Sequence, residues 1–115
     1  MDTNKYLNAY IKAAHTHGEE TVNGENYRKI NRAYDSVIKN FKNLIITEEG
    51  KNRLIELLDS SDEYVSSWTA SLMIFDYPKK CEPILLHISQ NKGVWASNTR
   101  TFLEEWNAGN LDKMY

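Results

Sequence analysis

Hydrophobic residues recur every three or four positions along almost the whole chain, and this spacing places side chains on one face of an α-helix. The longest series lies in the first half of the sequence. Its members are Tyr27, Ile30, Tyr34, Val37, Ile38, Phe41, Leu44 and Ile45. Similar spacing predicts helices over about 3–17, 25–45, 48–58, 61–75, 79–91 and 94–107. The chain is therefore predicted to be all-α, with about six helices.

Residues suited to capping stand before several of these helices. Asp2 or Thr3 can cap the first helix, and Thr47 suits the N-cap position of the third. Ser60 followed three residues later by Glu63 is a capping-box pattern, which would start the fourth helix.

Glycine and proline residues indicate where the helices are interrupted. The stretch 17–24 contains two glycines and is predicted to be a loop. Both prolines lie within 78–83, and the segment Asp76-Tyr77-Pro78 is expected to be a turn. Pro83 must lie in or just after the first turn of its helix, or the helix bends there. Gly109 is expected to end the last helix.

The last two helix pairs match each other when the chain is shifted by 30 residues. The matching pairs include Leu54 with Ile84, Ile55 with Leu85, Leu58 with Ile88, Val65 with Trp95, Thr69 with Thr99 and Leu72 with Phe102. Two helices per unit at this period are typical of an α-solenoid. The alternative is that any two amphipathic helical hairpins overlay fairly well at some shift. We expect one domain over 1–115, with a capping helix pair at 1–46 and repeat units at 47–76 and 77–109.

The start of the second helix in the first unit resembles that of a HEAT repeat. Residues 65–70, Val-Ser-Ser-Trp-Thr-Ala, follow a short turn as Val-Arg-x-x-Ala-Ala does in HEAT units, although Ser66 stands where Arg is usual. From Asp59 to the ending Leu-Glu-Glu-Trp-Asn-Ala-Gly at 103–109, the chain is similar to a bacterial family of short HEAT-like proteins of unknown function. This resemblance covers about half the chain. It implies antiparallel helix pairs stacked as a short, right-handed HEAT-like α-α superhelix, and it implies no reaction.

Length and composition indicate a single globular domain. The chain has 115 residues, of which 41% are hydrophobic and 26% charged. Cys81 is the only cysteine, so an internal disulfide is excluded and a reducing cytoplasm fits best. The polar N-terminus predicts no signal peptide, and no apolar run approaches the roughly 20 residues that span a membrane.

The charge is distributed unevenly around a net value of −2. Residues 1–47 hold seven basic and five acidic residues, whereas residues 48–115 hold seven basic and eleven acidic residues. An acidic C-terminal part favours a basic partner. Nucleic acid is not the expected partner, because the whole chain carries no basic excess.

No set of residues in the sequence predicts catalysis, a cofactor or a metal site. His15 and His17 are two residues apart instead of the four that place ligands on one helix face, so we expect a solvated helix end. His87 is predicted to lie at the edge of a helix face. Cys81 has no histidine nearby to activate it and is expected to be a structural thiol.

A contact surface is instead predicted in the second half of the chain. Exposed aromatic residues among acidic ones are typical of protein interfaces, and the second helices of solenoid units line a concave face. The predicted contact residues are Asp59, Asp62, Glu63, Tyr64, Ser67, Glu104 and Glu105. Plain helix caps and solvated faces are the alternative use of the carboxylates among them.

The expected function is therefore binding of another protein without catalysis. Small helical proteins of this kind resemble immunity proteins encoded beside bacterial toxins, which suggests a basic toxin domain such as a nuclease as the partner. The alternative is a nucleic-acid-binding or scaffolding helical-repeat protein. Its basic residues would be Arg28, Lys29, Arg32, Lys39 and Lys42. Because some of these positions are 11 residues apart, we do not expect them to form one stripe.

Overall fold

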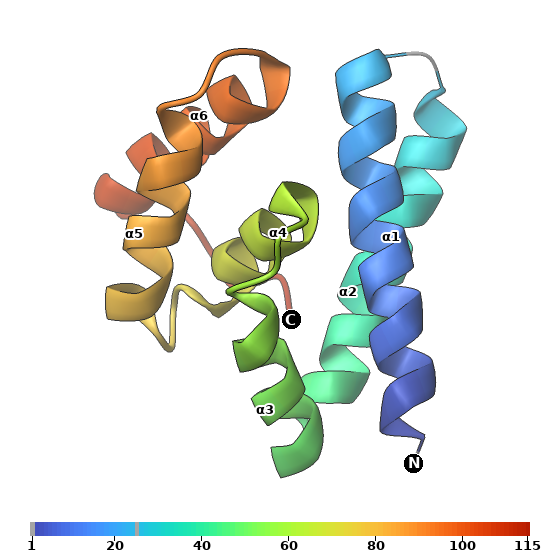
Figure 1. Cartoon of the computed structure of the whole chain (residues 1–115). Coiled ribbons are helices and arrows are strands. Elements are labelled where there is room, and N and C mark those ends of the chain that lie inside the picture. Colours follow the sequence, from blue (N-terminus) through green and yellow to red (C-terminus); the bar gives the residue numbers. More distant parts are fainter. Residues whose placement is uncertain (1, 25) are drawn as a thin grey trace.

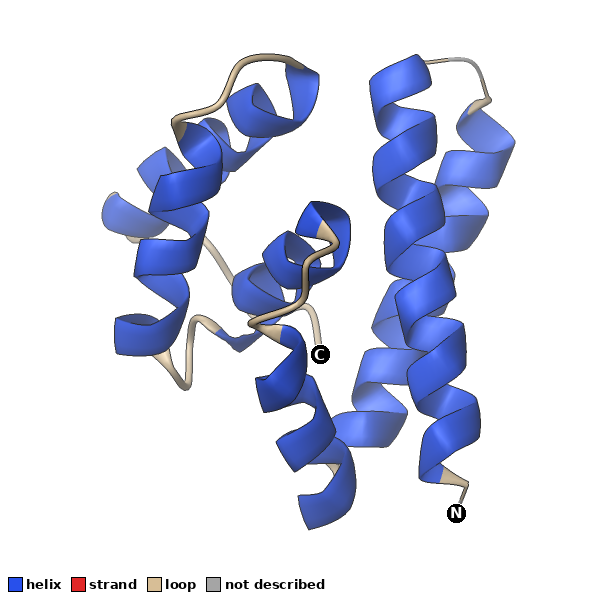
Figure 2. Ribbon diagram, in the orientation of Figure 1, coloured by secondary structure: helices blue, strands red, loops and turns tan. Residues whose placement is uncertain are grey.

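The structure is a computed structural model and describes residues 2–24 and 26–115. Within these residues all regular secondary structure is helical, which confirms the all-α prediction (Figure 2). The helices are α1 (Thr3–Asn23), α2 (Tyr27–Ile45), α3 (Glu48–Leu57), α4 (Glu63–Met73), α5 (Pro78–Ser89) and α6 (Val94–Asn107). Residue 25, where the sequence predicts the second helix to begin, lies outside the described residues.

The helices are arranged around α4 (Figure 1). The antiparallel pair of α1 and α2 forms one side of the molecule, α5 and α6 form the other, and α4 lies between them. α3 leads from the end of α2 to the start of α4. Every residue from Val65 to Ala70 is buried, so α4 is covered around its whole circumference and not on one face alone.

Short hydroxyl side chains allow α4 to be enclosed in this way. Ser66 donates to the backbone oxygen of Glu63 at 3.3 Å, and Ser67 donates to that of Tyr64 at 3.2 Å. Thr69 donates to the backbone oxygen of Val65 at 2.8 Å. A buried hydroxyl without a partner costs about 1–3 kcal/mol, and these local bonds avoid that cost.

The core links α4 to the α1–α2 pair. Tyr10 of α1 is fully buried, and its hydroxyl lies 2.9 Å from the hydroxyl of Thr69. Phe41 of α2 packs beside the Tyr10 ring at 6.2 Å between centroids. Burial raises the pKa of the Tyr10 hydroxyl, which therefore stays neutral.

The prediction of a loop over 17–24 is wrong, because α1 continues to Asn23. Gly18 lies inside the helix, where glycine normally costs about 1 kcal/mol relative to alanine. Its role is close packing. A Cβ atom at this position would overlap the ring of Tyr64, so glycine lets α4 approach the backbone of α1. Gly24 has a φ of 70° and supplies the left-handed residue that ends the helix.

The predicted caps are partly confirmed. Asp2 caps α1, and Thr47 caps α3 by accepting from the Gly50 amide at 3.0 Å. The capping box at Ser60 is wrong by two residues. Asp62 is the N-cap of α4, and Ser60 accepts from the Asp62 amide at 3.1 Å.

Pro83 and Gly109 lie in or beside the last two helices, α5 and α6. Pro83 lies five residues beyond Pro78, the first residue of α5, and therefore falls inside the helix just after its first turn. Gly109 has a φ of 74° and ends α6, as the sequence predicts.

In the second half, one pair of helix starts has the 30-residue shift, whereas α4 and α6 begin 31 residues apart, at Glu63 and Val94. α3 and α5 begin 30 residues apart, at Glu48 and Pro78. Thr69 and Thr99, which match at that shift, are both buried, and Thr99 donates to the backbone oxygen of Trp95 at 2.9 Å as Thr69 does to Val65. The N-terminal pair does more than cover one end, because α1 packs against both α4 and α6.

The residues after α6 form a strap across the core that the sequence analysis does not predict. The Tyr115 ring packs on buried Phe41 at 4.7 Å between centroids, and its hydroxyl donates to Asp76 at 3.1 Å. The Lys113 ammonium lies 3.1 Å from the same carboxylate. The strap therefore joins the α4–α5 turn, at Asp76, to Phe41 of α2.

The close approach of α1 and α4 predicts that Gly18→Ala destabilises the fold. Alanine favours a helix, but its Cβ would displace the Tyr64 side chain, and such overpacking costs about 1–3 kcal/mol. We expect a lower melting temperature by calorimetry. Asn8→Ala, at an exposed position of the same helix, is the control and should leave the melting temperature equal or higher. A melting temperature raised by G18A would contradict the packing described here.

Candidate protein-binding surface

The seven predicted contact residues do not form one face. Asp62 and Tyr64 lie where α1 packs against α4, whereas Ser67 is covered by Trp95 of α6. Asp59 and Glu63 lie on another side, facing α5. Glu104 and Glu105 are exposed near the end of α6.

Asp62 has two structural roles. One carboxylate oxygen accepts from the amides of Tyr64 and Val65 at 3.0 and 3.3 Å, which caps α4. The other oxygen lies 2.7 Å from Nδ1 of His15 on α1. Nε2 of His15 is 3.0 Å from Glu19. Both hydrogen-bond acceptors of Asp62 are thus engaged inside the molecule, between α1 and α4.

Tyr64 and Ser67 are also engaged by internal contacts. The Tyr64 ring sits on Gly18 and meets the Trp95 ring edge-to-face, with 5.1 Å between centroids. Ser67 is only 3% exposed and accepts from the Trp95 indole nitrogen at 2.9 Å. The side chain of Ser67 is therefore not available at the surface.

Asp59 and Glu63 line a surface groove, which we call the acidic groove. It has a volume of about 400 Å³ and lies between the turn preceding α4, the first turn of α4 and α5. Its remaining lining residues are Leu58, Ser60, Ser61, Ser66, Pro83, Ile84, His87 and Ile88. The groove thus combines an aliphatic floor with two exposed carboxylates at its edge.

The carboxylates of α6 lie apart from this groove. Glu105 accepts from the side-chain amide of Asn110 at 3.0 Å, just after the helix ends. Trp106, one residue on, donates to Glu82 of α5 at 3.0 Å and packs against Phe75. This end of α6 is therefore held to α5, with Glu104 and Glu105 facing solvent.

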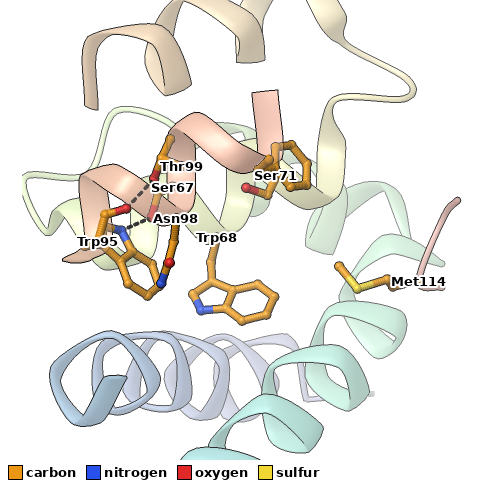
Figure 3. A pocket seen from close by; sticks show the side chains of 8 residues that line it. Ser67, Trp68, Ser71, Trp95, Asn98, Thr99 and Met114 are labelled. Carbon is orange, nitrogen blue, oxygen red and sulfur yellow. Dashed lines mark hydrogen bonds between the residues drawn. The ribbon is translucent and has the colours of Figure 1, made fainter. Parts of the chain in front are cut away.

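A second, smaller hollow lies between α4 and α6 (Figure 3). Its volume is about 150 Å³, and its lining is mainly aromatic and apolar. The lining residues are Ser67, Trp68, Ser71, Trp95, Asn98, Thr99, Phe102 and Met114. Figure 3 shows Trp68 and Trp95 projecting from α4 and α6 toward the α1–α2 pair.

His17 belongs to this aromatic cluster and not to a solvated helix end as predicted. Its Nδ1 accepts from the Trp68 indole nitrogen at 3.2 Å, and its ring lies 5.9 Å from that of Trp95. The Tyr34 ring of α2 closes the cluster against Trp68 at 5.6 Å. His17 lies seven residues after Tyr10 on the continuous helix α1, a spacing that would have predicted its burial.

The fold shifts the pKa values of the two histidines of α1 in opposite directions. The hydrogen bond to Asp62 is the main factor that raises the pKa of His15 above its usual 6.5, and the Asp62 and Glu19 charges raise it further. Burial lowers the pKa of His17 below the same value, since the charged ring would lose its hydration.

Cys81 is fully buried, and burial raises the pKa of its thiol to about 11, so the reactive thiolate is disfavoured. Within the described residues, 2–24 and 26–115, no three His, Cys, Asp or Glu side chains are grouped so that they could hold a metal ion.

Among the helices described, none is both long enough and apolar enough to cross a membrane. Comparison with family models, with curated proteins and with solved structures gives no match.

The two histidines predict opposite effects of acidification on stability. The pKa of His15 is raised in the folded state, so the protonated His15 ring stabilises the folded protein. This contribution to the free energy of unfolding is complete below about pH 6.5 and is lost as the pH rises through the raised pKa. The pKa of His17 is lowered in the folded state, so the neutral His17 ring is the form that the fold accommodates. Its contribution to the free energy of unfolding is complete above about pH 6.5 and is lost as the pH falls toward the lowered pKa.

Thermal melts of the wild type, His15→Gln and His17→Gln at about pH 8 and about pH 5.5 test this expectation. The stability advantage of the wild type over H15Q should grow on acidification. Its advantage over H17Q should shrink, because glutamine does not bind a proton. Changes of the same sign for both variants would contradict the arrangement of the two rings.

Proposed function

We propose that this chain is a non-enzymatic protein-binding module that neutralises a bacterial toxin domain as its immunity protein. The observation that carries this proposal is the acidic groove. Asp59 and Glu63 stand at the edge of an aliphatic floor, which suits a lysine or arginine side chain of a partner. The aliphatic stem of such a residue would lie on Leu58 and Ile84, and its charge would meet the carboxylates.

Charge supports a basic partner at this groove. Residues 48–115, which form α3 to α6 and the strap, hold eleven acidic and seven basic residues. Complementary charges accelerate association and suppress wrong partners. A nuclease domain binds the phosphates of nucleic acid through lysine and arginine side chains, and such a basic surface is complementary to the acidic charge of residues 48–115.

Binding explains the surface of this chain better than catalysis does. His15 is held between two carboxylates, His17 is packed among aromatic rings and Cys81 is buried. Each of these groups therefore has a structural role. The resemblance of the second half to short HEAT-like proteins agrees with a binding role, and we include that relationship in the proposal.

Neutralising the groove carboxylates tests the proposal. Asp59→Asn combined with Glu63→Gln removes both charges and keeps the shape of the groove. The assay co-expresses the chain with basic nuclease toxin domains, one at a time, and scores survival of the cells. Calorimetry then measures the Kd for the toxin domain that the wild type neutralises. We expect D59N/E63Q to weaken that binding by about tenfold or more.

The matched control is Asp35→Asn combined with Asp112→Asn. It removes two exposed carboxylates that do not line the acidic groove and changes the net charge equally. Its Kd should stay within about threefold of the wild type. If the wild-type chain rescues cells from none of the toxin domains, the proposal that it is an immunity protein is contradicted. Equal weakening by both variants would show that the groove is not the contact.

A further inference from the structure

Four of the five basic residues of α2 lie in one stripe on its exposed side. A helix turns about 100° per residue, so Arg28, Arg32, Lys39 and Lys42 fall within roughly 80° of its circumference. All four side chains are exposed. Arg28 and Lys39 share the stripe although they are 11 residues apart, because 11 residues make about three full turns. Lys29 lies about 100° from Arg28 and falls outside the stripe, so the five basic positions of α2 do not all belong to it.

The stripe lies opposite the face by which α2 joins the core. Val37, Phe41 and Leu44 are fully buried, and they lie about half a turn around the helix from the basic positions. The stripe is therefore centred on solvent. It extends for about 21 Å from Arg28 to Lys42. Asp35, the one acidic residue of α2, also lies on this face, between Arg32 and Lys39 along the helix, so the stripe carries four cations and one carboxylate.

A groove between α1 and α2 widens this stripe. It has a volume of about 510 Å³, and Lys12 of α1 faces Lys29 and Arg32 of α2 across it. The remaining lining residues are Ala9, Ala13, Thr16, Ala33 and Ser36. No carboxylate is among these described lining residues. Glu20, near one end of the groove, lies 3.0 Å from the Lys29 ammonium.

We propose that the phosphodiester backbone of nucleic acid binds this surface, formed by Lys12, Arg28, Lys29, Arg32, Lys39 and Lys42 and called here the basic surface. Lysine and arginine neutralise phosphates and release their counterions, which gives binding without base readout. The hydroxyls of Thr16 and Ser36 add donors suited to phosphate oxygens. A row of cations about 21 Å long matches a linear polyanion.

The shape of the basic surface favours nucleic acid over the other anionic partners. The groove floor consists of alanine methyl groups, so it offers no deep apolar pocket for the anchoring side chain of an acidic protein. An anionic membrane would need a broad apolar face beside the cations. Val37, Phe41 and Leu44 of α2 are fully buried, and the exposed apolar side chains of Tyr27 and Ile46 stand only at the two ends of the stripe.

The basic surface is independent of the acidic groove. Lys12 lies roughly 160–200° around α1 from Tyr10 and Ala14, which face the core. The groove carrying Asp59 and Glu63 belongs to the opposite side of the molecule, with α4 and α5. The two proposals can therefore fail separately.

Fluorescence anisotropy with a labelled single-stranded DNA oligonucleotide of about 20 nucleotides, and with the matching duplex, tests the proposal. We expect saturable binding to at least one of them at low salt. Neutralising about four phosphates predicts a slope of about −3 to −4 for the logarithm of the affinity against the logarithm of the salt concentration. Arg32→Glu combined with Lys39→Glu should weaken binding by about tenfold or more.

Lys79→Glu combined with Lys80→Glu is the matched control, because both lysines are exposed on α5 and the net charge changes equally. Its affinity should stay within about threefold of the wild type, and circular dichroism should show both variants folded. No saturable binding to either DNA, or equal weakening by both variants, would overturn the proposal. Binding to phosphatidylglycerol vesicles without binding to DNA would also overturn it.

Discussion

The enclosure of α4 is the constraint on which the other features of this molecule depend. A helix covered on every side must bring no unpaired polar side chain into the core, and Ser66, Ser67 and Thr69 meet this requirement with local hydrogen bonds. It must also be approached closely by its neighbours. Gly18 provides that approach on the α1 side, since its missing side chain leaves room for the Tyr64 ring. The residue types of α4 thus determine how closely α1 packs against it.

Because α1 covers α4 and packs against α6, the surfaces left for binding lie on the outside of the molecule. The acidic groove faces away from α1, and the basic surface lies on the far side of the α1–α2 pair. The chain is therefore charged oppositely on two sides while its net charge is only −2. A small net charge can conceal two local surfaces of opposite sign, each with its own class of partner.

Much of the fold was predictable from the sequence, because helical periodicity and capping are local properties. The N-caps at Asp2 and Thr47 and the helix end at Gly109 follow from neighbouring residues alone. The length of α1 was not predictable in this way. Gly18 is a turn signal locally, and its role in the helix depends on Tyr64, a residue distant in the sequence.

The candidate site was harder to predict for the same reason. Acidic residues that look alike in sequence differ in the fold, since Asp62 caps α4 and bonds to His15 while Glu63 lines the acidic groove. The sequence position of Ser67 predicted that its side chain would belong to a contact surface. In the fold the Trp95 indole of α6 covers it. The strap that ends at Tyr115 has no helical period, so no local pattern revealed its contact with the core.

Nuclear Overhauser spectroscopy of the folded chain tests the enclosure of α4 by α1 most directly. Cross-peaks between the Gly18 α-protons and the Tyr64 ring protons are expected, because the ring rests on that backbone. The same spectra should connect the rings of His17 and Trp68, whose centroids are 5.0 Å apart. Absence of both connections in a well-folded sample would show that α1 packs elsewhere and would contradict the enclosure of α4.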